Sequence, residues 1–284
     1  MPDRHEWLAG VPCWIDTAQP DPEAATEFYG GLFGWEFEDR MPEGADGRYY
    51  VATLGGRIVG AVGSQMGSSD APPAWGMYVA VDDADATAAK VRDAAGTVVM
   101  EPFDVGDAGR MAVFADPSGA VFCVWQAGET KGVEAVNEHG TWNFSGLHTR
   151  DVQGAQAFYG AVFGWELSSF GDDAGSAYWR MPGYGDFLER GDPDIRRRNA
   201  ELGAPDRFED AVATLMPLDD DATPPHWSTT FAVDDADAAA ARAEKLGATI
   251  LIPPTDAPWV RFTAVRDPQG ASFVASQFVR PTGA

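Results

Sequence analysis

The stretch DPEAATEFYGGLFGWE, residues 21–36, decides the fold because it returns as DVQGAQAFYGAVFGWE at residues 151–166, with nine of sixteen positions identical. A second pair, WGMYVAVDDADATAAK from Trp75 and WSTTFAVDDADAAAAR from Trp227, is identical at ten of sixteen positions. Repeats of this length predict two homologous domains in tandem. The 284 residues of the chain suit two domains of roughly 130 to 150 residues each, and a domain of that size can bury its own hydrophobic core.

Each half contains two similar units, which are delimited by residues that cap helices. An aspartate able to cap a helix start is followed thirteen residues later by a glycine able to adopt the left-handed conformation after the helix. This punctuation predicts four helices, at residues 21–34, 83–96, 151–164 and 234–247. Short apolar segments before and after each helix predict the order strand, helix, three strands in every unit.

The second half carries an insertion. The offset between matching residues grows from 130 at the first pair to 152 at the second, so 22 residues have been added, near residues 186–208. Asp192 and Pro193 predict the start of an extra helix and Gly203 its end. The insertion is interpreted either as a lid over the second domain or as a surface embellishment. The expected boundaries are 1–127 for the first domain, 128–140 for the linker and 141–284 for the second domain.

Composition excludes several classes of function. A net charge of −24 repels nucleic acid and anionic membrane surfaces at long range. The basic tract at residues 196–198 is interpreted as the solvated face of a surface helix with acidic residues nearby. Neither a signal peptide nor an apolar run long enough to span a membrane is evident, which predicts a cytoplasmic protein. Two cysteines, Cys13 and Cys123, cannot build a disulfide framework or a structural zinc site.

A third repeated pair matches DPSGAVFCVWQ from Asp116 with DPQGASFVASQ from Asp267. Together with FYG, FGWE and VDD, these words resemble the vicinal oxygen chelate superfamily, which includes glyoxalase I, extradiol dioxygenases and bleomycin-resistance proteins. The tandem layout with PGYGDFLE at residues 182–189 is similar to actinobacterial proteins labelled glyoxalase-like or hydroxylases. The resemblance implies an α+β fold of four βαβββ units. These would form two tandem glyoxalase-like domains, each with a U-shaped mixed sheet around a cavity.

Enzymes of this superfamily hold a divalent metal in the cavity, so the resemblance implies ligand positions on this chain. Those positions carry Trp14, Gly76 and Cys123 in the first domain and Phe144, Ser228 and Val274 in the second. Five of these six residue types are unsuitable for a hard divalent ion, so we expect no metal and no other cofactor. The alternative is an unorthodox site made by His148 and His226 with Asp186 or Glu189. Histidines that make ordinary hydrogen bonds are the simpler interpretation.

Aromatic residues at the metal positions predict a pocket for a hydrophobic or aromatic small molecule. The candidate ligand-binding residues are Trp14, Gly76, Cys123, Trp125, Phe144, Tyr184, Phe187, His226 and Ser228, of which Tyr184 and Phe187 belong to the insertion. The competing interpretation is that Trp14 and Phe144 fill the cavities as core residues.

Two candidate catalytic residues complete the set. Asp16 shares a strand face with Trp14, and a carboxylate in an aromatic cavity tends to have a raised pKa that suits a general base. His148 is its counterpart in the second domain. A surface-facing or backbone-bonded Asp16 is the alternative.

Three hypotheses for function stay open. The first is a metal-free protein that binds and sequesters a metabolite or antibiotic. The second is an enzyme such as a lyase, isomerase, hydroxylase or dioxygenase, either cofactor-free or with a non-standard metal site. The third confines function to the second domain, the first being degenerate. Two domains in one chain suit a monomer, and a homodimer is also compatible.

Overall fold

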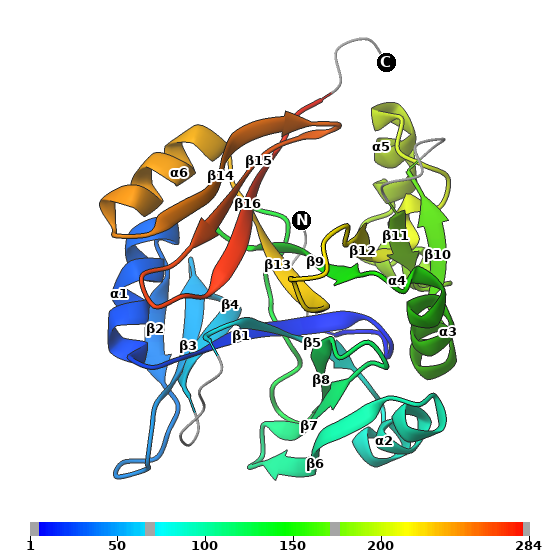
Figure 1. Ribbon diagram of the computed structural model, residues 1–284, viewed down its shortest axis with the longest axis horizontal. Coiled ribbons are helices and arrows are strands. Elements are labelled where there is room, and N and C mark those ends of the chain that lie inside the picture. Colours follow the sequence, from blue (N-terminus) through cyan, green and yellow to red (C-terminus); the bar gives the residue numbers. More distant parts are fainter. Residues whose placement is uncertain (1–5, 66–71, 171–176, 281–284) are drawn as a thin grey trace.

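The computed structural model describes residues 6–65, 72–170 and 177–280. Within them the chain forms two open eight-stranded sheets that pack together through helices (Figure 1). Each sheet is mixed, because its first strand pairs parallel with one neighbour and antiparallel with the other. The predicted α+β fold with two tandem glyoxalase-like domains is confirmed. The outer ends of the predicted domains, residues 1–5 and 281–284, lie outside the described residues.

The first sheet has the strand order β2-β3-β4-β1-β5-β8-β7-β6. Its strands are β1 (Pro12–Gln19), β2 (Glu36–Asp39), β3 (Tyr49–Leu54), β4 (Arg57–Ser64), β5 (Trp75–Ala80), β6 (Thr97–Val105), β7 (Gly109–Ala115) and β8 (Val121–Ala127). The central β1–β5 pair joins the two βαβββ units of this half.

The second sheet repeats this topology in the order β10-β11-β12-β9-β13-β16-β15-β14. Its strands are β9 (Trp142–Thr149), β10 (Glu166–Ser169), β11 (Ala177–Arg180), β12 (Ala211–Pro217), β13 (His226–Ala232), β14 (Thr249–Ala257), β15 (Val260–Arg266) and β16 (Ser272–Phe278). The predicted order of strand, helix and three strands therefore holds in all four units.

Helices α1 (Pro22–Phe33) and α3 (Val152–Phe163) begin and end where their caps predict. The Asp21 side chain accepts a hydrogen bond from a backbone N–H in the first turn of α1, and Gly34 ends that helix with a left-handed φ of 76°. The buried faces of both helices carry the Phe and Tyr of the repeated FYG word.

Two of the predicted cap residues are wrong, one at helix α2 (Ala84–Asp93) and one at helix α6 (Ala236–Lys245). Asp235, and not Asp234, caps α6. After α2 the left-handed residue is Ala95, with a φ of 63°, and not Gly96. Gly96 serves close packing instead, because a Cβ there would lie 2.7 Å from the ring of Phe158. The spacing rule misplaced both caps by one residue.

The repeated sequence words also join the two halves of the chain. The Tyr29 hydroxyl donates to Asp267 Oδ2 (2.8 Å) across the interface between the sheets, and Trp75 Nε1 donates to the Tyr29 hydroxyl (3.0 Å). The same arrangement recurs with Tyr159, Asp116 and Trp227. FYG, DPxG and the two tryptophans therefore have structural roles.

The insertion contains α4 (Tyr184–Glu189), α5 (Ile195–Leu202) and a short 3₁₀ helix η1 (Phe208–Asp210). Helix α5 ends at Gly203 as predicted, but it begins at Ile195 after Asp194, so the predicted start at Asp192 and Pro193 is wrong. Its residue Arg197 pairs with Asp194 and Glu201. Arg198 pairs with Asp192, so the basic tract is compensated by nearby carboxylates. Among the described residues, no helix is both long and apolar enough to cross a membrane.

Candidate functional site

On the first sheet, the predicted site residues lie in two adjacent rows of one face. Trp14, Tyr78 and Cys123 are cross-strand neighbours on β1, β5 and β8, and Asp16 faces Gly76 in the next row. Side chains two residues apart on a strand point to the same side, so the two rows share the concave face. The side chains of the first row are only 6%, 7% and 8% exposed.

Asp16 is the centre of a hydrogen-bonded cluster on this face. Its Oδ2 atom accepts hydrogen bonds from the hydroxyls of Tyr78 (2.8 Å) and Tyr49 (2.9 Å), and the Tyr49 hydroxyl accepts one from Trp14 Nε1 (3.1 Å). Burial raises the pKa of the Asp16 carboxyl to about 6, although both tyrosine bonds act in the opposite direction. The other oxygen, Oδ1, points toward Gly76, where a Cβ would lie 3.2 Å away.

Sequence reasoning missed both tyrosines that hold Asp16. Tyr78 shares the strand face of Gly76, so alternation along β5 could have found it. No comparable signal existed for Tyr49, because it comes from β3 and reaches Asp16 on β1 across the intervening strand β4. The alternative that Asp16 faces the surface or bonds to the backbone is wrong, because the hydroxyls of Tyr49 and Tyr78 donate hydrogen bonds to its carboxylate.

Two further residues of this face are engaged in packing. Trp125 is buried, and its Nε1 atom donates to the carbonyl of Thr130 in the linker (2.8 Å). Burial raises the pKa of the Cys123 thiol far above its usual range, so this cysteine stays a neutral thiol. The first concave face is thus largely filled by its own side chains.

The matching face of the second sheet is more open. Phe144, Thr230 and Val274 occupy the row equivalent to Trp14, Tyr78 and Cys123, and each is partly exposed. Four aromatic side chains gather there and are called the aromatic patch. Ring centroids lie 6.5 Å apart for Phe144 and Phe208, 5.4 Å for Phe208 and Tyr178, and 4.6 Å for Tyr178 and Phe170.

A small hollow lies where the second sheet meets the linker. Ala232 and Ser276 are cross-strand partners in the row beyond Thr230 and Val274, and they line a pocket of about 240 Å³ together with Asn143. Its volume is below the range of about 300 to 1,000 Å³ that is typical for drug-sized ligands. This pocket alone would therefore hold only part of such a ligand.

Beside the aromatic patch lies a polar group of residues. His148 Nε2 is 2.9 Å from Ser228 Oγ, and the rings of His148 and His226 stack nearly parallel with centroids 4.5 Å apart. Burial, together with the nearby His226, lowers the pKa of His148 to about 4. His148 is therefore uncharged at neutral pH.

The insertion contributes to this face through Phe208, which sequence reasoning did not single out. Phe208 lies in a 3₁₀ helix too short to show periodicity. The two insertion residues that were predicted to bind ligand, Tyr184 and Phe187, stack on each other with centroids 6.3 Å apart, and Tyr184 is buried. Their role in binding stays a prediction.

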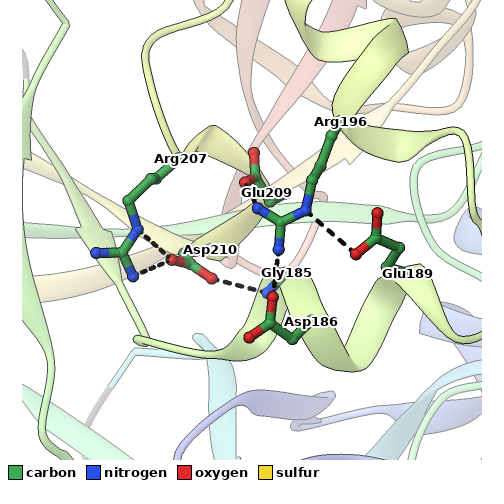
Figure 2. A network of polar contacts seen from close by, with 7 residues as sticks. All are labelled: Gly185, Asp186, Glu189, Arg196, Arg207, Glu209 and Asp210. Atoms are coloured by element: carbon green, nitrogen blue, oxygen red, sulfur yellow. Dashed lines mark hydrogen bonds and ion pairs between the residues drawn. The ribbon is translucent and has the colours of Figure 1, made fainter.

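Acidic residues of the insertion are held by Arg196 (Figure 2). Its guanidinium group contacts Asp186, Glu189 (3.3 Å) and Glu209 (2.6 Å), which ties α4 to α5 and η1. Asp186 and Glu189 are thus engaged by a cation and do not form a metal site with the histidines. Across the described part of the chain, no three His, Cys, Asp or Glu side chains are grouped closely enough to hold a metal ion.

Comparison with known proteins agrees with this architecture. The model of the Glyoxalase/Bleomycin resistance protein/Dioxygenase superfamily matches residues 14–124 and 143–274. The chain belongs to this superfamily.

Two curated relatives cover almost all of the chain. CFP32 of Mycobacterium tuberculosis, which carries the provisional name of a glyoxylase, is 41% identical over 96% of this chain and 97% of its own. The anthracycline biosynthesis protein DnrV of Streptomyces peucetius is 34% identical over 93% and 92%, respectively. A similar solved structure is the Mn(II)-bound glyoxalase of Novosphingobium aromaticivorans, with a TM-score of 0.61, 18% identity, and coverage of 95% of this chain and 82% of that one. At this identity, the structural likeness supports the fold alone.

The residues at the superfamily's metal positions do not fit a divalent ion in this chain. In the first sheet the Trp14 indole is a hydrogen-bond donor, and Gly76 offers no side chain. Cys123 is the one potential ligand among these three positions, and a catalytic divalent ion needs about three protein ligands. In the second sheet, the equivalent positions carry Phe144, Ser228 and Val274. The geometry therefore supports no step that depends on a metal at these places.

Proposed function

We propose that this chain binds a flat, hydrophobic or aromatic small molecule on the concave face of its second sheet. The observation that carries the proposal is the difference between two matched rows. Trp14 and Tyr78 are buried and hydrogen-bonded around Asp16, whereas Phe144 and Thr230 are partly exposed. The second sheet therefore has apolar surface left for a ligand.

The composition of the second face suits such a ligand. Small-molecule sites are mostly apolar with a few polar groups, and the aromatic patch lies beside Ser228, His148 and Thr214. Aromatic side chains stack on flat rings in offset or edge-to-face geometry, which adds to the gain from burial.

The names of relatives support the same class of ligand. DnrV is named for anthracycline biosynthesis, and anthracyclines are fused-ring aromatic compounds. The superfamily's name includes bleomycin resistance. A protein whose binding face lacks metal ligands could sequester a flat metabolite, and it could equally present that metabolite to another enzyme.

The test replaces Phe144 and measures binding of a flat hydrocarbon probe, fluorene, by calorimetry and native mass spectrometry. Phe144→Asp places a charge in the aromatic patch beside Phe208 and should abolish binding, because the carboxylate loses solvation when the ring of the ligand covers it. The matched control is Trp14→Phe on the first sheet, which should bind fluorene as the unmodified protein does. Unchanged affinity in Phe144→Asp would rule out this site.

A second function is favoured by Asp16. An ionisable carboxyl with one oxygen held by two tyrosines and the other facing Gly76 has the geometry of a general base. We propose it as the proton acceptor of a cofactor-free enzyme in preference to His148, whose pKa is lowered and whose Nε2 atom is engaged by Ser228.

This enzymatic alternative can be tested without knowing the substrate. Hydroxy ketones incubated in deuterated water would be followed by NMR for exchange of the proton next to the carbonyl. Exchange that the protein catalyses and that Asp16→Asn abolishes would support it. Equal exchange with both proteins would exclude it for this class of substrate.

A further inference from the structure

Three polar side-chain atoms converge around Gly146 on the second sheet. Thr214, Gly146 and Ser228 are direct cross-strand partners on β12, β9 and β13. A Cβ placed on Gly146 would lie 2.8 Å from Thr214 Oγ1, 3.1 Å from Ser228 Oγ and 3.9 Å from His148 Nε2. We call the space defined by these four residues the Gly146 niche.

The niche retains capacity for hydrogen bonds. Ser228 Oγ is bonded to His148 Nε2 (2.9 Å) and donates weakly to the Gly146 carbonyl (3.3 Å). For Thr214 Oγ1 there is no hydrogen bond to another described residue. A hydroxyl can donate one hydrogen bond and accept others, so the niche can both donate to and accept from a ligand.

The niche is also free of charge. Burial keeps His148 neutral at pH 7, and the other polar members are hydroxyl groups. The equivalent position on the first sheet is different, because Asp16 stands there between Ala61 and Gly76. A carboxylate therefore stands on the first sheet where the second has a glycine flanked by the hydroxyls of Thr214 and Ser228.

The niche adjoins the aromatic patch on the same face. Tyr178 of the patch is the cross-strand partner of Thr214, and Phe144 lies two residues before Gly146 on β9. A ring lying on the patch can therefore place a substituent over Gly146.

We propose that the Gly146 niche recognises an uncharged oxygen substituent, a ketone or phenolic hydroxyl, on the flat ring system bound by the aromatic patch. This inference rests on the proposed function. A ketone oxygen accepts from the Thr214 hydroxyl, whereas a phenol can donate to Thr214 or Ser228. Burying an ionised substituent in an uncharged niche would leave its charge without a partner, which selects against carboxylates.

The experiment compares 9-fluorenone with fluorene, two tricyclic probes that differ in one ketone oxygen. Calorimetry with the full chain should show fluorenone binding about tenfold more tightly, as one well-formed hydrogen bond allows. Fluorene is the more hydrophobic probe, so burial alone would give the opposite order.

Three variants locate the source of that preference. Thr214→Val keeps the shape of the side chain and removes the hydroxyl, and Ser228→Ala removes the other hydroxyl. Thr214→Val should lower fluorenone affinity several-fold and leave fluorene affinity unchanged. Ser228→Ala should leave both affinities unchanged, because the single hydroxyl hydrogen of Ser228 already donates to the Gly146 carbonyl. Ser145→Ala is the matched control, because Ser145 precedes Gly146 on β9 and is buried on the opposite face. It should leave both affinities unchanged.

The outcomes separate this inference from the proposed function. If both probes bind the unmodified protein equally, the niche proposal is overturned while binding on the aromatic patch stands. If neither probe binds, both proposals fail. A ketone preference that survives in Thr214→Val would also overturn the niche, since the oxygen would then be recognised elsewhere. Tighter binding of fluorenone-2-carboxylate than of fluorenone would contradict the selection against charge.

Discussion

Replacing Asp16 by asparagine should remove a defined part of the pH dependence of folding. In the folded protein, burial raises the pKa of the Asp16 carboxyl from 3.8 to about 6. The folded state therefore holds this proton more tightly than the unfolded state does. Its contribution to stability is fully present below pH 3.8 and is lost as the pH rises through 6.

The size of the effect follows from the two pKa values. A difference between about 6 and 3.8 corresponds to about 3 kcal/mol, because each pH unit is worth about 1.4 kcal/mol. Asparagine cannot ionise, and its side-chain oxygen can still accept the hydrogen bonds of Tyr49 and Tyr78. The free energy of unfolding of the unmodified protein, minus that of Asp16→Asn, should fall by about 2 to 3 kcal/mol between pH 4 and pH 7.

Urea unfolding followed by tryptophan fluorescence at a series of pH values measures this difference. Subtracting the two curves removes contributions from the other carboxylates. Tyr78→Phe provides a second check: it removes a donor to the ionised form, so the inflection should move above pH 6. If the free energy of unfolding depended on pH in the same way for Asp16→Asn and for the unmodified protein, the pKa of Asp16 would not be raised. The proposal that Asp16 acts as a general base would then lose its support.

Three further substitutions, of which Tyr50→Phe is a control, test how the two halves of the chain are joined. Tyr159→Phe should lower the free energy of unfolding by about 1 to 3 kcal/mol, because Asp116 in the interface loses a buried donor. Tyr50→Phe removes a more exposed hydroxyl and should change the free energy of unfolding by less than about 0.5 kcal/mol. Equal effects of the two tyrosine substitutions would contradict a special role for the buried hydroxyl. Gly96→Ala should destabilise the protein by about 1 to 3 kcal/mol, because the new methyl group overlaps the ring of Phe158. Denaturant midpoints measure all three changes, and an unchanged midpoint in Gly96→Ala would show that the ring yields freely.

Much of the fold could be predicted from the sequence because it is encoded locally and repeatedly. Aspartate and glycine at fixed spacing delimited α1 and α3 correctly. The same rule misplaced the cap at the end of α2, where Ala95 adopts the left-handed conformation, and the cap at the start of α6, where the second of two adjacent aspartates caps the helix. Local signals of this kind do not specify which glycine is needed for packing against another helix.

The candidate site was less predictable because it depends on contacts between distant strands. Strand alternation placed Trp14 and Asp16 on one face, and the structure agrees. Tyr49, one of the two partners of Asp16, could be found only from the register of β3, which the sequence does not specify. The contact of Phe208 with Phe144 depends on how the insertion folds over the sheet. Ligand identity, cytoplasmic location and oligomeric state stay predictions.

The two copies have diverged in a complementary way at the centre of their sheets. The first copy pairs Asp16 with Gly76, and the second pairs Gly146 with Ser228, so the glycine has changed strands and the carboxylate is absent from the second. One face therefore presents a carboxyl oxygen next to its glycine, and the other presents neutral hydroxyls next to its own. An oxygen acceptor that suits the hydroxyls would be repelled by an ionised Asp16. The two faces are consequently not interchangeable as binding sites. A ligand that binds to the second sheet should not compete with a proton donor that binds beside Asp16 on the first sheet.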